Sequence, residues 1–311
     1  MTFYLVTGGA GFIGSHIAQA LLKKNQKIRI FDNFSSGKIE NLIGLEGGLE
    51  IINGDLRDKD QVRKAVMDID IIFHEAAFVS NPLSLQQPTE CFDINVHGTE
   101  NLLEASRLAG VKRIVLASSA AVYGKSNEFP LSEEAEVNPL TPYAASKSIN
   151  EIYAGLYSRS YDMEVVALRY FNVFGPRQSP DSEYAGAIPI FIGNLMDKKQ
   201  ITIFGDGKQT RDLIYVDDVV RANLIAAKYP SVAGQVFNIC TGIETSVQVL
   251  VDNLRNLFPP SRVPTKTEAR AGDLYRSLGS PDKARKILNF VPETSLIDGL
   301  TKTVEWMQKC Q

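Results

Sequence analysis

The feature of this sequence that most limits its fold is a glycine-rich turn near the N-terminus, Gly8-Gly9-Ala10-Gly11-Phe12-Ile13-Gly14. It follows a strand-like segment, Phe3 to Thr7, and precedes an amphipathic stretch at about 12–24. Where backbone must lie against a pyrophosphate and helix against strand, a turn this tight leaves no room for Cβ atoms. The dipole of the following helix then stabilises the phosphate charge. This context predicts a dinucleotide site, although a glycine-rich turn can also serve backbone geometry alone.

Short β-branched segments alternate with amphipathic stretches through the first half of the chain, as is typical of parallel strands joined by crossover helices. The expected strands are Phe3 to Thr7, Lys27 to Phe31, Leu49 to Asn53, Ile71 to His74, Arg113 to Ser118 and Glu164 to Arg169. The expected helices lie at about 12–24, 59–67, 88–110 and 141–160. We therefore predict an α/β fold with a doubly wound parallel Rossmann sheet, which binds ligands at the carboxyl ends of its strands.

The pattern loosens after Gly175-Pro176-Arg177, where turn-rich segments separate shorter elements. This change predicts two domains. Residues 1–172 form the cofactor-binding domain, to which segments near 210–242 return, and residues 173–311 form a smaller α/β substrate-binding domain.

Composition excludes several classes of function. The formal net charge is −3, with acidic and basic residues mixed along the chain, so we expect no nucleic-acid partner. There is no apolar run of bilayer-spanning length and no signal-like N-terminus, which favours a cytoplasmic protein without a membrane partner. Neither the cysteines nor the histidines form a ligand cluster, so we expect no metal. These residues are Cys91, Cys240, Cys310, His16, His74 and His97.

Two carboxylates follow expected strands and indicate which dinucleotide is bound. Asp32 ends the second strand, 18 residues past Gly14, where it can accept hydrogen bonds from both hydroxyls of the adenosine ribose. A 2′-phosphate would be repelled there, so we expect NAD and not NADP. Asp55-Leu56, just beyond the third strand, is similarly positioned to meet the adenine, or else forms a plain turn.

A tyrosine and a lysine, Tyr143 and Lys147, stand at i and i+4 on one face of an expected helix. The positive charge is expected to favour the phenolate and to bring the pKa of Tyr143 into a usable range, while the lysine can also bind the nicotinamide ribose. Ser118-Ser119 ends the strand that begins at Arg113, on the same edge of the sheet as the glycine turn. A hydroxyl there can share a proton with Tyr143, although serine at a strand end is often only a turn former.

Together these motifs resemble the extended short-chain dehydrogenase/reductase family, and the similarity covers nearly the whole chain. The remaining motifs that carry it are His74-Glu75-Ala76-Ala77, Asn95-Val96-His97-Gly98-Thr99, Ser118 to Gly124, Arg169-Tyr170-Phe171-Asn172, Gly205-Asp206-Gly207, Arg211-Asp212, Tyr215-Val216-Asp217-Asp218 and Arg270-Ala271-Gly272-Asp273.

The resemblance implies a role for each matching position. Ser119 matches the family's catalytic Ser/Thr, Tyr143 its general base and Lys147 its ribose-binding lysine. The implied NAD contacts are Gly8, Gly11, Phe12, Ile13, Gly14, Asp32, Asn33, Asp55, Leu56, Ala76, Ala77, Asn95, Ser118, Tyr143 and Lys147. The implied UDP-sugar contacts are Ser84, Ser119, Tyr143, Asn172, Arg211, Arg270, Asp273 and Ser277. Arginine suits the diphosphate because its planar fork donates paired hydrogen bonds; a structural Arg211–Asp212 ion pair is the alternative.

The residues after Ser119 bear on the reaction. Similar 4,6-dehydratases carry an Asp-Glu pair where this chain has Ala120 and Ala121, and UDP-glucuronate decarboxylases carry a Glu in place of Ala121. Because a methyl group cannot transfer a proton, the resemblance favours a UDP-hexose 4-epimerase that works through a transient 4-keto sugar. Another nucleotide-sugar epimerase or reductase, or a non-catalytic NAD-binding module, remains an alternative.

Two further expectations rest on the resemblance. Ser277 falls where a small residue admits N-acetyl sugars, which indicates UDP-GlcNAc as well as UDP-glucose, unless it is a plain loop serine. The helices at 88–110 and 141–160 carry apolar residues beyond one core stripe, which implies an intersubunit four-helix bundle and a homodimer, or burial within one chain. Those residues are Leu102, Leu103, Ile149, Ile152, Tyr153 and Leu156.

Overall fold

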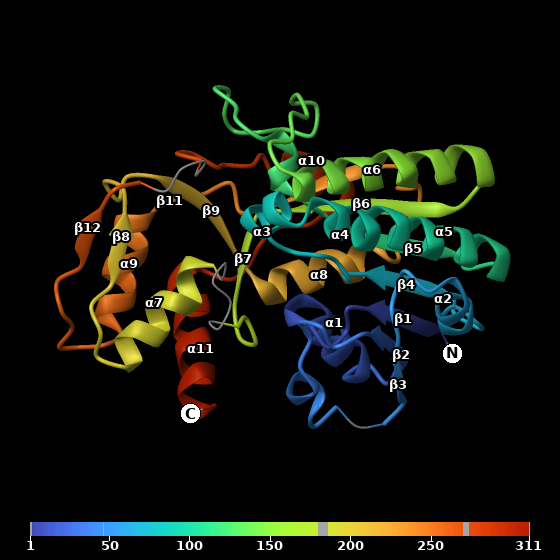
Figure 1. The fold of residues 1–311 in the computed structure, drawn as a ribbon, viewed down its shortest axis with the longest axis horizontal. Coiled ribbons are helices and arrows are strands. Elements are labelled where there is room, and N and C mark those ends of the chain that lie inside the picture. The colour runs from blue at the N-terminus through green and yellow to red at the C-terminus, as the bar shows by residue number, and fades with distance from the viewer. Residues whose placement is uncertain (1, 46, 180–185, 270–273, 311) are drawn as a thin grey trace.

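The computed structural model describes residues 2–45, 47–179, 186–269 and 274–310, and its centre is a sheet of seven parallel strands (Figure 1). These are β1 (Phe3–Thr7), β2 (Lys27–Asp32), β3 (Leu49–Asn53), β4 (Ile71–His74), β5 (Arg113–Ser119), β6 (Glu164–Tyr170) and β10 (Val236–Ile239). Their order is β10-β6-β5-β4-β1-β2-β3, so the direction of winding reverses between β1 and β4. The doubly wound α/β fold is confirmed, and all six expected strands form.

Successive side chains of each strand point to opposite faces of this sheet, so both faces present apolar side chains. Helices cover both faces and bury them. In β1, Tyr4 and Val6 pack in one core cluster with α1 (Phe12–Leu22) and α8 (Val216–Ala226). Phe3 and Leu5 pack in the other cluster. That cluster also contains residues of α2 (Lys59–Ala65), α5 (Gly98–Ala109) and α6 (Pro142–Tyr161).

The helix expected at 88–110 is interrupted. It consists of α4 (Pro88–Phe92), a π-helical turn at Asp93–His97 and α5, with the short α3 (Asn81–Gln86) before it. Thr99, in the first turn of α5, donates its hydroxyl proton to the carbonyl of Asn95 inside the π-helical turn at 2.6 Å. π-helical turns are common at functional sites, where they re-aim side chains.

The start of α6 is fixed by its own sequence. Thr141 accepts a hydrogen bond from the Ala144 backbone N–H, and Pro142 occupies the first helical position. Tyr143 and Lys147 therefore lie on the first two turns. Further along, Ile152 and Leu156 are exposed, by 66% and 41%, whereas Leu102 and Leu103 are buried within the chain. Of the two alternatives for these leucines, an intersubunit surface or burial within one chain, the second is correct, because they fill the core beneath α5.

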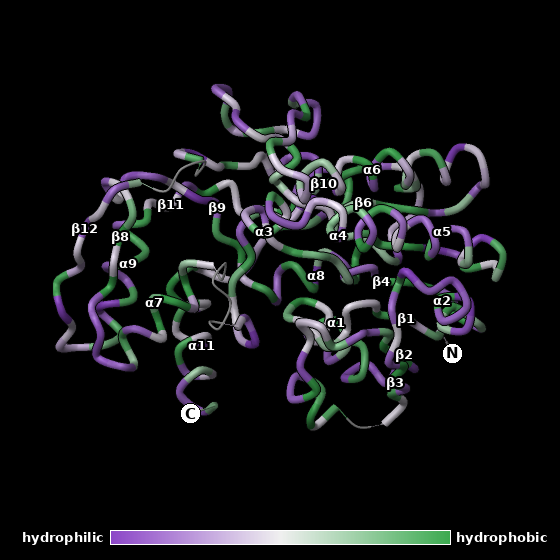
Figure 2. The backbone as a smooth tube through the Cα atoms, in the orientation of Figure 1, coloured by the Kyte–Doolittle hydropathy of each residue, from purple (hydrophilic) through white to green (hydrophobic). Residues whose placement is uncertain are grey.

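The second part of the molecule is built on two small sheets. One has the order β11 (Glu244–Ser246), β9 (Thr210–Tyr215), β7 (Asn172–Phe174), and the other pairs β12 (Thr265–Thr267) with β8 (Thr202–Phe204). The helices of this region are α7 (Ala187–Met196), α9 (Val247–Asn256) and α11 (Leu296–Lys309), whereas α10 (Asp282–Leu288) packs on β10 of the large sheet. After β9 the chain returns through α8 and β10 to the large sheet. In Figure 2 much of α7, α8 and β6 is green, which marks their residues as hydrophobic.

Two features are absent from the described residues. None of their helices combines the length and apolar character that a membrane span needs. No group of three or more His, Cys, Asp or Glu side chains among them could hold a metal ion.

Candidate active site

The glycine turn brings three backbone segments together at the carboxyl edge of the sheet. Gly8 has a positive φ of 65°, and a Cβ there would lie 2.6 Å from the backbone N of Ala76. A Cβ on Gly14 would lie 2.2 Å from the Gly8 carbonyl oxygen. Helix α1 begins at Phe12 with no side-chain cap on its first N–H groups. This cradle fits a pyrophosphate, because free N–H groups at a helix start bind anions and no side chain fills the space.

Asp32 is oriented by the backbone of the turn. Its carboxylate is 7% exposed and accepts hydrogen bonds from the N–H groups of Ala10, at 2.9 Å, and Phe34, at 2.8 Å. A Cβ on Gly37 would lie 2.9 Å from both carboxylate oxygens. Each oxygen keeps a further acceptor site, so the group fits a ribose diol and opposes a phosphate.

Asp55 and Asn33 lie side by side, as expected for residues after adjacent strands. The Asn33 amide donates to Asp55 at 3.0 Å, and the same carboxylate accepts two hydrogen bonds from the Arg57 guanidinium and one from the Arg57 backbone N–H. The Arg57 guanidinium holds the pKa of Asp55 well below its usual range. Leu56, by contrast, is 5% exposed and packs in the core beside Gly98.

Asn95 is also among the expected cofactor contacts, but its side chain binds protein groups. The amide oxygen accepts from the Phe78 N–H at 2.7 Å, and the amide nitrogen donates to the Phe78 carbonyl and to Ser146. Asn95 therefore fixes the segment after Ala76 and Ala77, which follows β4 at the glycine turn. A direct cofactor contact for Asn95 remains a prediction.

Ser119 and Tyr143 converge. The Ser119 hydroxyl is close enough to lower the pKa of the Tyr143 phenol as a hydrogen-bonding group, and Tyr143 is 8% exposed at the start of α6. Lys147 is 4% exposed, donates to the Ala117 carbonyl at 2.8 Å and has its ammonium 5.9 Å from the centre of the Tyr143 ring. The strand end and the first two turns of α6 thus bring a phenol, a hydroxyl and an ammonium into one place.

Burial dominates the electrostatics of this group. It raises the pKa of Tyr143 to about 12 and lowers that of Lys147 to about 8, and the hydrogen bond from Ser119 opposes the rise at Tyr143. The expectation that Lys147 brings the pKa of Tyr143 down is therefore wrong in its net direction. The reason is that desolvation penalises the phenolate by more than its neighbours stabilise it.

Two of the expected site residues make hydrogen bonds to protein groups that support the site. Ser84 is fully buried and accepts the Tyr143 backbone N–H at 3.1 Å, which orients the start of α6. Ser118 donates to Glu151, whose carboxylate makes a buried ion pair with Arg169 at 2.7 Å. A direct contact of Ser84 with substrate, and of Ser118 with cofactor, remains a prediction.

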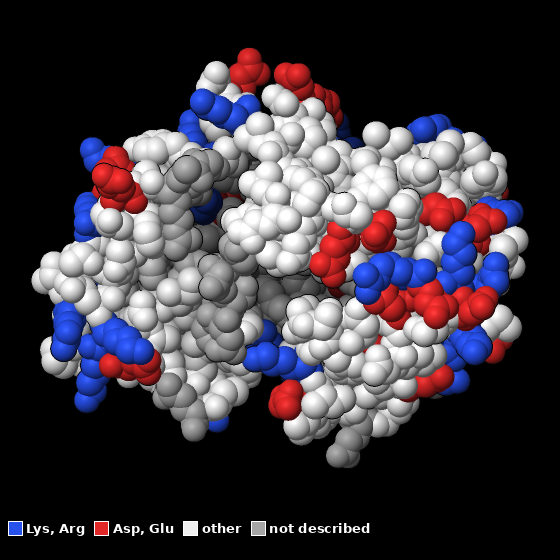
Figure 3. Space-filling model, viewed as in Figure 1, with Lys and Arg blue, Asp and Glu red and all other residues white. Residues whose placement is uncertain are grey.

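A cavity of about 400 Å³ between β7, β9, α7 and α9 brings two expected substrate residues, Asn172 and Arg211, together. Gln178 and Gln209 also line it, and each has a buried amide oxygen with no hydrogen-bond partner among the described residues. In Figure 3 this face of the molecule is hollowed near its middle, and both basic and acidic side chains border the hollow. Unpaired buried acceptors are costly, so these two amides fit a ligand that donates hydrogen bonds.

Sequence patterns carry no signal for these glutamines, because an amide side chain has no characteristic spacing. Ser277 does not line this cavity, but its backbone pairs with β9, next to Arg211: its N–H donates to Thr210 and its carbonyl accepts from Asp212. The remaining expected substrate contacts, Arg270 and Asp273, lie outside the described residues.

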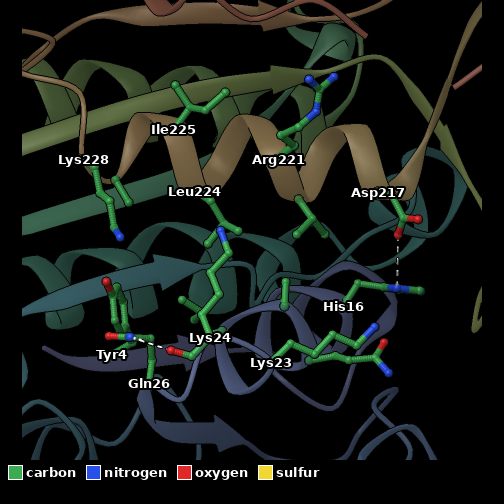
Figure 4. Close-up of a pocket in the computed structure, with 15 residues that line it drawn as sticks. Tyr4, His16, Lys23, Lys24, Gln26, Asp217, Arg221, Leu224, Ile225 and Lys228 are labelled. Atoms are coloured by element: carbon green, nitrogen blue, oxygen red, sulfur yellow. Dashed lines mark hydrogen bonds and ion pairs between the residues drawn. The ribbon is translucent and has the colours of Figure 1, made fainter. Parts of the chain in front are cut away.

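Another hollow, of about 390 Å³, lies between α1 and α8 and is lined by none of the expected site residues (Figure 4). His16 lies at one end of it, with its ring 3.9 Å from Asp217 and 3.0 Å from the Pro176 carbonyl. Burial lowers the pKa of His16 to about 4, so the ring is neutral at neutral pH. These contacts fasten α1 to the turn that leads into the second part of the chain.

The seven-stranded sheet, its glycine cradle and the Ser–Tyr–Lys group define a dinucleotide-dependent enzyme. The family model for the NAD dependent epimerase/dehydratase family matches residues 4–240, and the chain belongs to that family. It is an NAD-dependent nucleotide-sugar epimerase/dehydratase, and its cofactor is NAD.

Relatives with different reactions align along nearly the entire chain. A UDP-glucose 4-epimerase of Mycolicibacterium smegmatis is 40% identical over 98% of both chains. A UDP-N-acetyl-α-D-glucosaminuronate decarboxylase of Bacillus cytotoxicus is 34% identical over 99% of this chain and 98% of the relative. A solved UDP-N-acetylglucosamine 4-epimerase of Methanobrevibacter ruminantium, in complex with UDP-N-acetylmuramic acid, superposes with a TM-score of 0.96 at 36% identity, covering 100% of this chain and 99% of the other.

Gly14→Ala tests the cradle. The new Cβ would meet backbone and not a movable side chain, so we expect NAD affinity to fall at least about tenfold and stability to fall by about 1–3 kcal/mol. The matched control is Gly193→Ala in α7, where a Cβ would meet nothing within 4 Å; it should gain about 0.5–1 kcal/mol. Calorimetric NAD titration and urea unfolding measure both effects, and unaltered NAD affinity in Gly14→Ala would refute the cradle.

Proposed function

We propose that the chain is a UDP-hexose 4-epimerase, which interconverts UDP-glucose with UDP-galactose and also accepts UDP-GlcNAc and UDP-GalNAc. One observation carries the proposal: the hydroxyls of Ser119 and Tyr143 meet in the site, while the next two side chains, Ala120 and Ala121, are methyl groups. Proton transfer is thus available at one sugar oxygen but not at the neighbouring carbon that elimination would require.

In this proposal Tyr143 accepts the proton of the sugar 4-hydroxyl, directly or through Ser119. NAD, when bound, supplies the reversible acceptance of hydride from sugar C4. Tyr143 must act as phenolate, and the hydrogen bond from Ser119 favours that form. The ammonium of Lys147 adds positive potential in a poorly solvated site, where a nearby charge acts strongly. The same proton returns from Tyr143 when the 4-keto sugar is reduced again.

Epimerisation also requires the sugar to present its other face without leaving. Asn172 and Arg211 line one cavity with the acceptors of Gln178 and Gln209, which supports a UDP site anchored away from Tyr143. Arginine suits the diphosphate, and the amide oxygens suit donors such as a uracil N–H. With the nucleotide held there, the hexose can rotate about its link to the diphosphate while the site stays closed to exchange.

Loss of water or of carbon dioxide demands a further acid or base beside the reacting carbon. The family resemblance implies carboxylates in dehydratases and decarboxylases at the positions of Ala120 or Ala121. The Ala121 N–H instead donates to the Ser119 hydroxyl oxygen at 3.2 Å, which helps orient that hydroxyl. The 4-epimerase reaction is the one that needs no group beyond those present.

Tyr143→Phe should lower turnover of UDP-galactose about 10²- to 10⁴-fold, because the proton acceptor is lost, while NAD binding persists. Tyr153→Phe on the same helix is the matched control and should retain activity. Chromatographic separation of UDP-glucose from UDP-galactose measures turnover. Wild-type rates in Tyr143→Phe would remove the assigned base and with it the proposed chemistry.

Ser277→Tyr tests the sugar range. Because the Ser277 backbone is paired to β9 beside Arg211, we propose that a bulky side chain there narrows the sugar site. UDP-GlcNAc turnover should fall at least about tenfold, which corresponds to a loss of roughly 1.4 kcal/mol of transition-state binding. UDP-glucose turnover should be largely kept. Equal effects on both substrates, or none on either, would contradict a selective role.

We also propose a homodimer in which α6 contributes the exposed Ile152 and Leu156. Exposed apolar side chains on one helix face favour pairing with a second copy. Light scattering should give about twice the chain's mass of 34.3 kDa, and Ile152→Glu should shift it toward the monomer. A monomeric wild-type protein at micromolar concentration would refute this arrangement.

A further inference from the structure

Three side chains of α6 form a stripe along the end of β5. Tyr143, Lys147 and Glu151 are spaced four residues apart, so they lie on one face of the helix. The Lys147 ammonium donates to the Ala117 carbonyl at 2.8 Å, and the Glu151 carboxylate accepts a hydrogen bond from the Ser118 hydroxyl. The proposed function gives roles to Tyr143 and Lys147 but none to Glu151, although its side chain is only 8% exposed.

Glu151 joins the ends of two strands of the large sheet. Ser118 of β5 and Arg169 of β6 are register partners, so their side chains leave the sheet next to each other on the same face. One oxygen of Glu151 accepts from the Ser118 hydroxyl and, at 2.8 Å, from Nε of Arg169. The other oxygen accepts from Nη2 of Arg169 at 2.7 Å. A bidentate pair of this kind has a fixed geometry.

The same guanidinium supports the chain on the other side of Ser119. Tyr123 ends the short helical turn that follows Ser119, and the centre of its ring lies 4.6 Å from the guanidinium carbon of Arg169. The Tyr123 hydroxyl donates to the side chain of Asn238 at 2.7 Å, and Asn238 is the register partner of Arg169 on β10. The ion pair therefore supports the chain both directly before Ser119 and four residues after it.

We propose that Glu151 is a positioning residue for Ser119 and Tyr143: paired with Arg169, it holds the end of β5 against α6 so that the two hydroxyls meet. This inference rests on the roles given to Ser119 and Tyr143 in the proposed function. The Ser119 hydroxyl accepts the Ala121 N–H within its own turn, so its place relative to α6 depends on the groups that hold that turn. Glu151 itself makes no contact with substrate in this proposal.

A buried ion pair is better suited to fixing geometry than to adding stability. Removing two charges from water costs free energy that their attraction recovers only in part, and apolar residues of similar size are often as stabilising. The bidentate contact with Arg169 nevertheless fixes the plane of the Glu151 carboxylate, and a hydrogen bond to a charged acceptor is stronger than one to a neutral group. Ser118 is thereby held at one place on α6, and Ser119 follows it in the chain.

Ser118→Ala removes the link between β5 and Glu151 and leaves the ion pair in place. We expect kcat for UDP-galactose to fall about tenfold, because a misplacement of about 1 Å can cost about 10²-fold. KM and NAD affinity should stay within about twofold, since binding groups are unchanged. The charge of Glu151 remains in this variant, so an effect of that charge on Lys147 cannot cause the loss. An unchanged kcat, or a loss of NAD affinity in its place, would overturn the proposal.

A double-mutant cycle separates the positioning of Ser119 from a general loosening of the structure. In a Ser119→Ala background there is no hydroxyl left to misplace, so Ser118→Ala should cost little further activity. The matched control is Ser158→Ala, which removes hydrogen bonds between the last turn of α6 and the backbone of Val165 on β6. Its kcat should equal that of the wild type. Equal losses from Ser118→Ala in both backgrounds, or a similar loss in Ser158→Ala, would contradict the positioning role.

The ion pair is tested by replacing both of its members. A single substitution of Glu151 leaves Arg169 as a buried cation without its counter-charge, which can prevent folding. The double substitution Glu151→Leu with Arg169→Met removes both charges and keeps similar volumes. Its kcat should fall as in Ser118→Ala, and adding Ser118→Ala to it should have no further effect. Independent, additive losses would show that Ser118 does not act through Glu151.

Hydrogen exchange tests the same link without substrate. Because the Ala121 N–H donates to the Ser119 hydroxyl at 3.2 Å, its exchange rate in the NAD-bound protein reports how firmly the turn is held. Exchange should become at least about tenfold faster in Ser118→Ala but not in Ser158→Ala, while the N–H groups of β1 are unaffected. An unchanged rate at Ala121 would overturn the positioning role. Faster exchange in a protein that turns over no UDP-hexose would support that role and refute the proposed function.

Discussion

The close approach of backbone around Gly8 is the constraint on which the rest of the site depends. A Cβ on Gly8 or on Gly14 would collide with backbone. Because glycine has no Cβ, α1 can start directly against β1, and β4 can end directly beside both. This contact aligns the helix start with the carboxyl edge of seven strands. Asp32, Glu75 and Ser119 each follow or end one of those strands, so one packing contact determines the spacing of cofactor-binding and proton-transferring groups.

That edge concentrates ionisable groups where water is scarce. Desolvation is the largest cause of the pKa shift at Tyr143, Lys147 and Glu75, raising it at the two acids and lowering it at the ammonium. Burial thus disfavours the Tyr143 phenolate, the Lys147 ammonium and the Glu75 carboxylate. Each charged form must be stabilised by neighbouring groups. Chemistry that needs a phenolate beside an ammonium is then sensitive to every charge in the cluster, including charges that touch no substrate.

The sequence was sufficient for the large sheet because its strands are short apolar runs bounded by turn residues. The largely buried β1 and β4 begin and end where expected, and so does β3, the partly exposed edge strand. The sequence also predicted that Ser119 and Tyr143 lie close together, since Ser119 is at the end of a strand and Tyr143 is at the start of the helix that follows. Other features were not accessible. Spacing indicates that Lys147 is near Tyr143 but says nothing of solvation, so the pKa of Tyr143 was expected to move the wrong way. Leu102 and Leu103 show the same limit, because an apolar pattern does not distinguish a core from an interface.

Relatives that align along nearly the entire chain include a 4-epimerase, a decarboxylase and a 4,6-dehydratase, so the fold by itself does not determine which reaction is performed. In this chain the two side chains after Ser119, Ala120 and Ala121, offer no transferable proton, and the carboxyl group of Glu75, which follows β4, accepts a hydrogen bond from Tyr170. That carboxyl group is thus committed to a contact with a tyrosine on another strand. In the proposed function, the absence of a carboxyl group directly after Ser119 is therefore what separates a reversible proton transfer at one oxygen from the irreversible loss of a leaving group.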